Sequence, residues 1–298
     1  MKSTKNLRGT GVAITTPFHK DGSINFKGFK KLLEHLLAGK VDYLVPLGTT
    51  GESVTLTRDE KIAVLDFVVE VVDQRVPVVA GVGGNNTQDV LKCLSEFDLS
   101  GVDAILSVTP YYNKPSQKGL YQHYKMIVNE SPVPVILYNV PGRTGCNMLP
   151  ETTLNLANDF ENVIGVKEAS GNMEQIMNII RDKPEGFLVI SGDDAITFPL
   201  IAAGADGVIS VVANAFPKEF SEMVRTSLKG NFDKGRELHY LLSEITPLLF
   251  AEGSPAGIKS VLSMMDICED YLRLPLVNIS KSLQNKLAAA VEKIHAVA

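Results

Sequence analysis

The chain contains no tryptophan and only three cysteines among its 298 residues. Cys93, Cys146 and Cys268 are far apart and odd in number, a pattern that matches neither a disulfide framework nor a zinc site. The five histidines show none of the close spacings typical of metal ligands. We therefore expect a protein that uses no metal, has no disulfide scaffold and resides in the reducing cytoplasm.

Basic residues and long apolar runs are also scarce. The formal net charge is −5 and the isoelectric point is near 5.6, which argues against nucleic acid as a partner. No uninterrupted run of about 18 apolar residues occurs, and residues 1–6 are not followed by the apolar stretch of a signal peptide. We therefore expect no membrane partner. With 45% apolar residues, the chain can still bury a substantial core.

The most regular feature is a series of short apolar runs rich in β-branched residues. Each run is closed by Gly, Thr, Asn or Asp and followed by a helical pattern. Eight such runs occur, at residues 11–16, 43–47, 76–82, 104–109, 133–139, 163–167, 187–191 and 207–212. Eight consecutive βα units predict an α/β fold of the (β/α)₈ TIM-barrel type, because a doubly wound sheet more often has five or six strands.

The pattern between and after the runs predicts helices and two regions. Apolar residues recur at helical period over 26–37 and are followed by Gly39, and Thr57 and Glu60 have the spacing of a capping box. Beyond about residue 225 the strand pattern stops, and three apolar-periodic stretches cover roughly 232–250, 255–268 and 280–296. We predict a barrel carrying the active site over residues 1–225, and a helical C-terminal region over 226–298 packed on it.

A TIM barrel presents the carboxyl ends of all its strands on one face, where active sites form. The side chains at these ends supply an amine, several hydroxyls and a guanidinium, and they include no histidine. The candidates are Thr15, Thr16, Thr49, Thr50, Glu52, Tyr111, Tyr112, Tyr138, Asn139, Arg143, Lys167, Gly192, Asp193 and Asp194.

Lys167 is the most informative of these residues, because it ends the buried run 163–166. A free lysine amine has a pKa of about 10.4, and desolvation favours the neutral form that a Schiff base requires. The alternative is a lysine that extends to solvent from a strand end. Taken alone, Lys167 leaves both interpretations open.

Three neighbouring groups suit the chemistry of an acidic substrate. Tyr138 ends the strand before that of Lys167, so its hydroxyl is a candidate proton donor and acceptor. Thr49 and Thr50 lie on a glycine-bounded turn that can bind a carboxylate, and Arg143 can clamp a second one. Each also has a purely structural interpretation: a half-buried tyrosine, local threonine caps and a surface arginine.

Two glycine-containing stretches could suggest a magnesium site and a nucleotide site, but we prefer structural interpretations of both. For the stretch 192–194 we prefer a helix N-terminus with acidic caps to a magnesium site, because no third ligand is evident. The stretch 81–84 lacks the last glycine of a dinucleotide fingerprint and is weak evidence for a nucleotide site.

Several motifs in one order resemble the dihydrodipicolinate synthase family of pyruvate-dependent class I aldolases. The resemblance covers essentially the whole chain. It rests on GTTGES at 48–53, TPYYNKP at 109–115, YNVPGRTG at 138–145, VKE at 166–168, SGDD at 191–194, GVIS at 207–210 and LRLP at 272–275.

The resemblance implies a catalytic assignment without any cofactor. Lys167 would form an imine with pyruvate, and Tyr138 would act as the general acid and base. Thr50 and Tyr112 would complete its proton relay, and Thr49 with Thr50 would hold the pyruvate carboxylate. The Tyr112 position reaches a neighbouring subunit in this family, so the resemblance implies at least a dimer and commonly a homotetramer.

The remaining substrate contacts are also implied by the family. The backbone of Ile209 and Gly192 would contact the pyruvate, and Arg143 would bind the carboxylate of L-aspartate 4-semialdehyde. Condensation of these two substrates is a step of lysine and diaminopimelate biosynthesis.

The family's lysine effector site is matched only in part. Tyr111, Ser53 and Asn85 agree with it. However, Arg58 and Lys61 stand where lysine-sensitive bacterial members often carry histidines, and Asp89 stands where they carry glutamate. Since cations repel a cationic effector, we expect weak or absent inhibition by lysine.

Two other functions remain to be distinguished. N-acetylneuraminate lyase and other 2-oxo acid aldolases of the same superfamily share the lysine and the tyrosine, but Thr50 and Arg143 favour the synthase. A barrel without catalytic activity that serves as a ligand sensor or scaffold would bind pyruvate without covalent capture.

Overall fold

The computed structural model describes residues 7–297, so residues 1–6 and 298 of the two predicted regions lie outside it. Within this range eight parallel strands form one sheet in the order β2-β1-β8-β7-β6-β5-β4-β3. A parallel bridge between Leu44 and Val78 joins its two edges. The predicted (β/α)₈ barrel is therefore confirmed. Its strands are β1 (Gly9–Ala13), β2 (Tyr43–Val45), β3 (Val79–Gly81), β4 (Ala104–Val108), β5 (Val135–Asn139), β6 (Val163–Glu168), β7 (Leu188–Ser191) and β8 (Gly207–Ser210).

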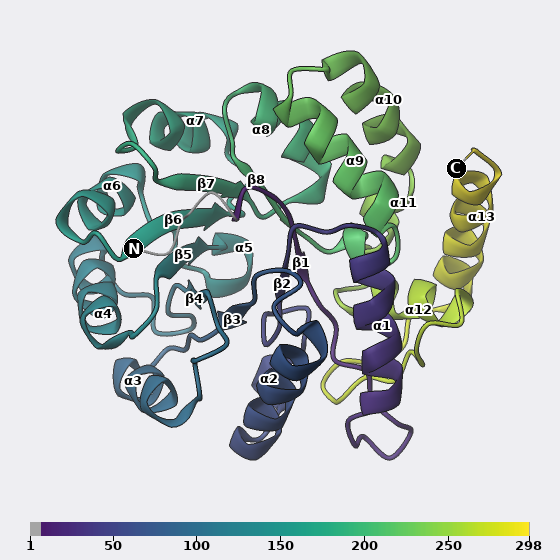
Figure 1. Ribbon diagram of the computed structural model, residues 1–298, viewed down its shortest axis with the longest axis horizontal. Helices are drawn as coiled ribbons and strands as arrows, with labels where there is room; N and C mark the ends of the chain where they lie inside the picture. Colours follow the sequence, from purple (N-terminus) through teal and green to yellow (C-terminus); the bar gives the residue numbers. More distant parts are fainter. Residues whose placement is uncertain (1–6, 298) are drawn as a thin grey trace.

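Helices surround the strands as an outer ring (Figure 1). Those of the ring are α1 (Phe26–Ala38), α2 (Arg58–Val72), α3 (Thr87–Glu96), α4 (Gln117–Glu130), α6 (Pro150–Asp159), α7 (Met173–Asp182), α8 (Thr197–Ala202) and α9 (Pro217–Leu228). The short helix α5 (Pro141–Thr144) lies inside the ring, directly after β5. Short 3₁₀ turns η2 (Ser53–Thr55), η3 (Asp194–Ile196) and η4 (Val212–Asn214) follow β2, β7 and β8. The chain ends with α10 (Phe232–Leu242), α11 (Ile245–Leu248), α12 (Ala256–Met264) and α13 (Lys281–Val297).

Alternation along the strands divides the core into two layers. Successive strand side chains point to opposite faces, so one set fills the barrel and the other packs under the helices. Tyr43, Ile136 and Ile190 belong to the inner cluster, whereas Leu44 and Leu137 belong to the outer one. Apolar residues therefore fill the barrel interior and leave the polar strand-end residues at its rim.

The helix signals of the sequence are confirmed. Helix α1 begins at Phe26 and ends with Gly39 as its C-cap. Helix α2 begins with a complete capping box, in which Thr57 accepts from the Glu60 N–H and the Glu60 carboxylate accepts from the Thr57 N–H. Both helices also begin where a side chain, Asn25 before α1 and Thr57 before α2, accepts a hydrogen bond from a free backbone N–H.

Several element boundaries differ from the predicted ones, and for two of them the structure shows the physical reason. The run predicted at 11–16 forms a strand only to Ala13, because the Thr15 N–H donates to the side chain of Asn214 at 3.2 Å instead of to a neighbouring strand. The stretch predicted at 232–250 is divided into α10 and α11. Pro247 lacks an N–H, so it cannot continue the hydrogen bonds of a single helix.

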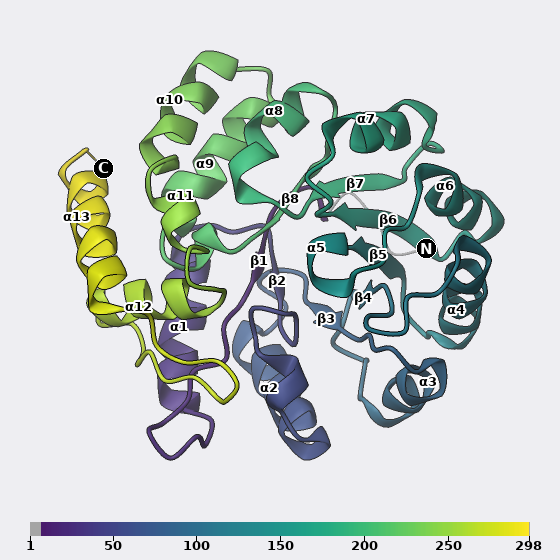
Figure 2. The ribbon, with the colours of Figure 1, turned by 180° about the vertical axis from the view of Figure 1, so that it is seen from behind.

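The C-terminal helices lie beside the barrel and not apart from it. Helix α13 stands at the outer edge next to α11 and α12, as seen from both sides (Figures 1 and 2). Helices α11 and α12 in turn contact the turns η3 and η4 at the carboxyl ends of β7 and β8. Helix α9 runs through residue 225, and the division of the chain into two regions at that residue stays a prediction.

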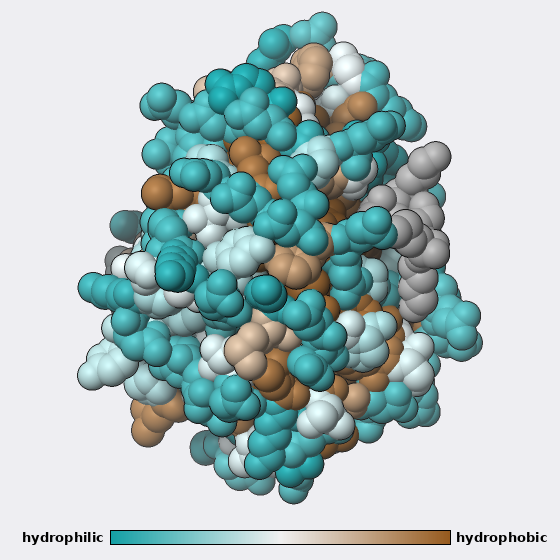
Figure 3. Space-filling view, turned by 90° about the vertical axis from the view of Figure 1, so that its left-hand side faces the viewer, coloured by the Kyte–Doolittle hydropathy of each residue, from teal (hydrophilic) through white to brown (hydrophobic). Residues whose placement is uncertain are grey.

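The face of the molecule drawn in Figure 3 is mostly hydrophilic. On the face drawn there, apolar side chains show between hydrophilic ones. Individual apolar residues of α4, α6 and α7 are partly exposed, among them Met126 and Met177 at 41% and 43%. Single exposed apolar residues are common on soluble proteins and need no special explanation.

We predict that His123, at the contact between α3 and α4, makes the stability of the fold sensitive to acid. Its side chain is buried, Nδ1 lies 2.9 Å from the hydroxyl of Thr87, and burial lowers the pKa of the imidazole from 6.5 to about 4. The folded state therefore favours the neutral ring, and the stability that follows is present above pH 6.5 and is lost between pH 6.5 and 4. We expect a loss of about 3 kcal/mol from this residue.

Urea unfolding at pH 7 and pH 4 measures this contribution. The His123→Gln variant has no ionisable group at the position, so its stability should fall by about 3 kcal/mol less than that of the wild type over this pH range. Equal losses in the two proteins would contradict the assignment.

Candidate active site

A cavity of about 550 Å³ opens at the carboxyl ends of the strands. Six of the eight residues that the sequence nominated as catalytic or substrate-binding line it: Thr49, Thr50, Tyr138, Arg143, Lys167 and Gly192. They come from loops and strand ends separated by up to 143 residues in sequence, and the barrel brings them to one opening. The position agrees with the general placement of active sites in this fold.

Lys167 and Tyr138 are direct neighbours in this cavity. They form a register pair between β5 and β6, and residues paired in parallel strands lie on the same face of the sheet. The Lys167 amine lies 4.4 Å from the centroid of the Tyr138 ring. Both residues are buried, at 5% and 7% exposure. The amine is therefore held in a mostly desolvated position beside a phenol.

Gly192 provides the space that the Lys167 side chain occupies. A Cβ atom at Gly192 would lie 3.0 Å from Cε of Lys167, 3.0 Å from the carbonyl of Glu168 and 2.6 Å from Cβ of Ala169. The Gly192 N–H donates to the Glu168 carbonyl at 2.7 Å. A side chain at this position would displace the lysine, so this glycine is needed for the close approach.

The loop after β2 contributes two threonines to the lining of the cavity. Gly51 N–H donates to Gly48 carbonyl and Glu52 N–H donates to Thr49 carbonyl, each at 3.1 Å. These bonds close two successive turns around Thr49 and Thr50. Thr50 is buried and Thr49 is exposed. The turn therefore places Thr50 inside the cavity and Thr49 at its opening.

Arg143 lies on the short helix α5 and is exposed at the rim of the cavity. Figure 2 shows α5 close to the ends of β4 and β5. The adjacent Thr144 is buried, and its hydroxyl donates to the carbonyl of Cys146 at 2.9 Å. This bond holds the loop in place, and the exposed guanidinium of Arg143 can meet a ligand from solvent.

Two nominated residues do not line the cavity. The side chain of Tyr112 is 89% exposed and its backbone is left-handed, with φ of 71°. Ile209 is 1% exposed and belongs to the inner core cluster of the barrel. In the chain by itself, the structure therefore does not bring Tyr112 to Tyr138.

A buried polar network lies on the outer face of β5 and β6, and the sequence reasoning missed its role. Glu168 is fully buried, and one of its carboxylate oxygens accepts from Asn139 at 2.8 Å and from Gln175 at 2.9 Å. The other accepts from the Ser170 N–H at 3.1 Å. Because Asn139 follows Tyr138 and Glu168 follows Lys167, the network holds the strand ends that carry these two nominated residues. Asn139 and Glu168 are polar residues at matching positions of two neighbouring strands, and this pairing is the feature of the sequence from which the network could have been predicted.

The C-terminal region also reaches the cavity. Phe250 and Ser254 are among its lining residues. Nothing in their sequence context indicates this position, because it depends on how the C-terminal helices pack on the barrel.

The stretch 192–194 carries acidic caps, as the sequence predicted. Asp193 is the N-cap of η3, and its carboxylate accepts from the Ala195 N–H at 2.9 Å. Asp194 is buried and accepts from the backbone N–H groups of Val211 and Val212. Burial raises the pKa of the Asp194 carboxyl above its usual range. These carboxylates serve as caps of the loops after β7 and β8.

A second and larger cavity, of about 930 Å³, opens near the amino-terminal ends of β5 to β7. Its lining includes Val133, Val163 and Phe187, and neither Lys167 nor Tyr138 belongs to it. Catalytic groups in TIM barrels lie at the opposite ends of the strands. The smaller cavity is therefore the candidate active site.

The chain is similar to known proteins over nearly its whole length. The chain matches the dihydrodipicolinate synthetase family over residues 6–294. It is 56% identical to 4-hydroxy-tetrahydrodipicolinate synthase of Parabacteroides distasonis over 272 residues, which cover 91% of this chain and 92% of the relative. It is 51% identical to the protein of the same name from Flavobacterium psychrophilum, covering 94% and 95%.

A solved structure shows the same fold. A monomeric dihydrodipicolinate synthase variant superposes with a TM-score of 0.95 at 40% identity, covering 98% of each chain. The fold, the strand-end residues and the match over nearly the whole length lead to one conclusion: this chain belongs to the dihydrodipicolinate synthetase family.

Proposed function

We propose that this chain is a 4-hydroxy-tetrahydrodipicolinate synthase, a lyase of the class I aldolase type that condenses pyruvate with L-aspartate 4-semialdehyde. The observation that carries the proposal is the buried amine of Lys167, 4.4 Å from the Tyr138 ring in a cavity rimmed by Thr49, Thr50 and Arg143. The relatives that share this name match the chain over nine-tenths of its length or more.

The reaction begins with covalent capture of pyruvate. The Lys167 amine attacks the ketone carbon and water leaves, which gives an imine. Tyr138 supplies and removes the protons of this step. Loss of a methyl proton then gives an enamine, whose terminal carbon is a nucleophile. The threonine turn at 48–51 holds the carboxylate of pyruvate during these steps.

The second substrate enters from the rim. Arg143 binds the carboxylate of aspartate semialdehyde, and the enamine carbon adds to its aldehyde. Attack of the substrate's own amine on the imine then closes the ring and releases Lys167. No step of this sequence draws on a metal or an organic cofactor.

Oligomerisation belongs to the same proposal. Tyr112 is 89% exposed in the isolated chain, and its hydroxyl would complete the proton relay of Tyr138 and Thr50 in a neighbouring subunit. We therefore propose a homo-oligomer of at least two chains, with a tetramer as the common form of the family. The three cysteines are free thiols, as reducing cytosol maintains them, and we assign the enzyme to the cytoplasm.

Borohydride reduction in the presence of pyruvate tests the central claim. We expect a stable adduct on the peptide that contains Lys167, detected by mass mapping, together with turnover of aspartate semialdehyde. Absence of the adduct would disprove the imine mechanism. Cleavage of N-acetylneuraminate without turnover of the semialdehyde would select the lyase instead, and pyruvate binding without any adduct would select a sensor or scaffold.

We also expect weak or absent inhibition by lysine. Lys61 lines the cavity, whereas the charge of the neighbouring Arg58 is paired with Glu96 at 2.7 Å. Lys61 is therefore the cation that a lysine effector would meet near Ser53 and Tyr111. A titration of the condensation rate with L-lysine measures this, and submillimolar inhibition would contradict the prediction.

A further inference from the structure

We propose that Glu52, Lys259 and Arg273 are positioning residues that hold the loop 48–52, and with it Thr49 and Thr50, in its binding conformation. The inference rests on the proposed role of these threonines in binding pyruvate. Glu52 lies directly after them in the loop following β2, whereas Lys259 and Arg273 belong to α12 and the segment after it.

The loop has a conformation that needs support at both ends. Leu47 and Glu52, which flank the turn, have left-handed backbones with φ of 60° and 53°. Residues other than glycine adopt this region at a cost, because Cβ crowds the following carbonyl. Such a conformation persists only where the surroundings hold it. If Glu52 were released, its backbone would relax and Thr50 would move with it.

The Glu52 side chain is held by two groups from the C-terminal region. Glu52 is 2% exposed, and one carboxylate oxygen accepts from the amine of Lys259 at 2.5 Å. The other accepts from the backbone N–H of Arg273 at 3.1 Å. Lys259 is 0% exposed, and its amine also donates to the carbonyl of Tyr271 at 2.8 Å. The pair is therefore fixed at both ends.

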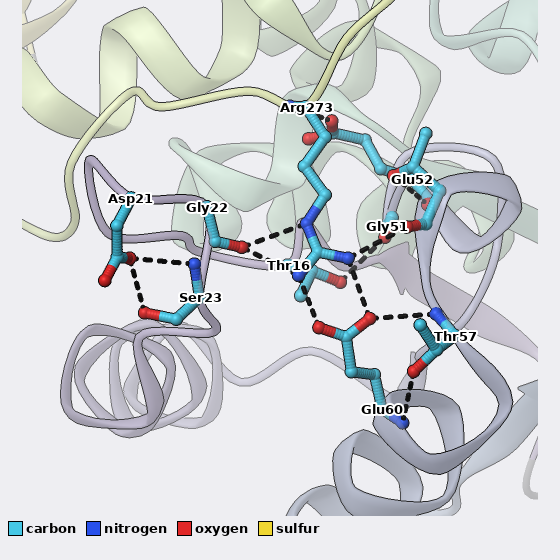
Figure 4. Close-up of polar contacts among 10 residues, drawn as sticks. Thr16, Asp21, Gly22, Ser23, Gly51, Glu52, Thr57, Glu60 and Arg273 are labelled. Atoms are coloured by element: carbon cyan, nitrogen blue, oxygen red, sulfur yellow. Dashed lines mark hydrogen bonds and ion pairs between the residues drawn. The ribbon is translucent and has the colours of Figure 1, made fainter.

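Arg273 fastens its own segment to the loops around the site, as Figure 4 shows. Its guanidinium donates to the carbonyl of Gly22 at 2.7 and 3.0 Å and to the carbonyl of Thr55 at 2.8 Å. It also forms a two-point ion pair with Glu60, the glutamate of the capping box that begins α2. The hydroxyl of Thr16 donates to the Gly51 carbonyl at 2.7 Å and ties the same loop to the end of β1.

Net stability is a poor explanation for the buried pair. Removing two charges from water costs free energy that their attraction repays only in part, and apolar replacements of similar volume are often neutral or stabilising. The neighbours of Lys259 on α12, Ile258 and Leu262, are buried apolar residues that show what such packing looks like. The conformation that the pair imposes on the loop explains it better.

The test compares three variants of the full-length enzyme. Lys259→Met removes the ion-pair partner of Glu52, and Glu52→Gln with Lys259→Met removes both charges while keeping the shape. Lys183→Met is the control: Lys183 forms an ion pair of the same 2.5 Å length with Asp206, away from the loop 48–52. For each variant the Tm, the kcat and the KM for both substrates are measured.

We expect Lys259→Met to lose thermal stability and to raise the KM for pyruvate about tenfold, with little change for the semialdehyde. The double variant should recover the Tm and keep the raised KM. The control should lose Tm and keep the wild-type KM. Recovery of both Tm and KM in the double variant, or an equal rise of KM in the control, would overturn the proposal. If Lys259→Met does not fold, the double variant alone decides.

Borohydride trapping separates this inference from the proposed function. If the wild type forms no adduct on Lys167, the proposed function fails and the inference fails with it. If the wild type forms the adduct and the double variant reaches half-maximal trapping at the same pyruvate concentration, only the positioning role is overturned. A higher half-maximal concentration in the double variant supports it.

Discussion

Replacement of Lys167 with methionine should abolish condensation and lower kcat/KM by at least about 10⁵-fold. Methionine has nearly the length of lysine but carries no amine, so neither the imine nor the enamine can form. Borohydride should then trap no pyruvate on the protein. The loss is expected in kcat even at saturating pyruvate, because the missing group performs the chemical step.

The same substitution should leave the fold intact or make it more stable. Lys167 is 5% exposed, and burying an amine costs free energy that methionine does not. We therefore expect a Tm equal to or above that of the wild type. Lys167→Arg is the matched control, since it keeps a cation that stays protonated and cannot act as a nucleophile. Measurable turnover by the arginine variant would show that charge, and not the amine nucleophile, carries the reaction.

Replacement of Tyr138 with phenylalanine should lower kcat by about 10²- to 10³-fold, the usual size of a lost general acid or base. The ring that lies 4.4 Å from the Lys167 amine remains, so packing around the amine is preserved. Only the hydroxyl that carries protons is removed. The rate of imine formation, followed by quenching with borohydride at successive times, should fall with kcat, whereas the final extent of trapping should not.

Tyr43→Phe provides the control for this experiment. Tyr43 belongs to the same inner cluster of the barrel, and its hydroxyl donates to the carbonyl of Val208 at 3.3 Å. Loss of this bond should cost about 1 kcal/mol of stability and leave kcat unchanged. Equal losses of kcat in the two variants would mean that Tyr138 acts through packing and not through proton transfer.

Much of the fold follows from local sequence patterns. β-branched runs closed by turn formers and followed by helical periods predict eight βα units, and the strand order of the barrel then follows from their order in the chain. The position of Lys167 beside Tyr138 was predictable for the same reason. Consecutive strands become neighbours, and residues at matching strand ends become a register pair.

Other features of the site depend on contacts between distant parts of the chain. Lys259 and Arg273 bind Glu52 across 207 and 221 residues, and Phe250 and Ser254 line the cavity from the same region. The exposure of Tyr112 and the burial of Ile209 likewise follow from the packed barrel and not from their motifs.

The physical reason for this difference is that local sequence patterns depend on short-range interactions, whereas the contacts of the C-terminal region are long-range. Periodicity and turn chemistry report backbone preferences over a few residues, and they determined the elements, their order and the amine at a strand end. Which C-terminal side chain meets which loop is decided by close packing and by the pairing of buried charges, which exist only once the barrel has closed. The sequence by itself therefore determined the barrel and the position of Lys167 beside Tyr138, and the tertiary structure decided how the threonine loop beside that pair is held.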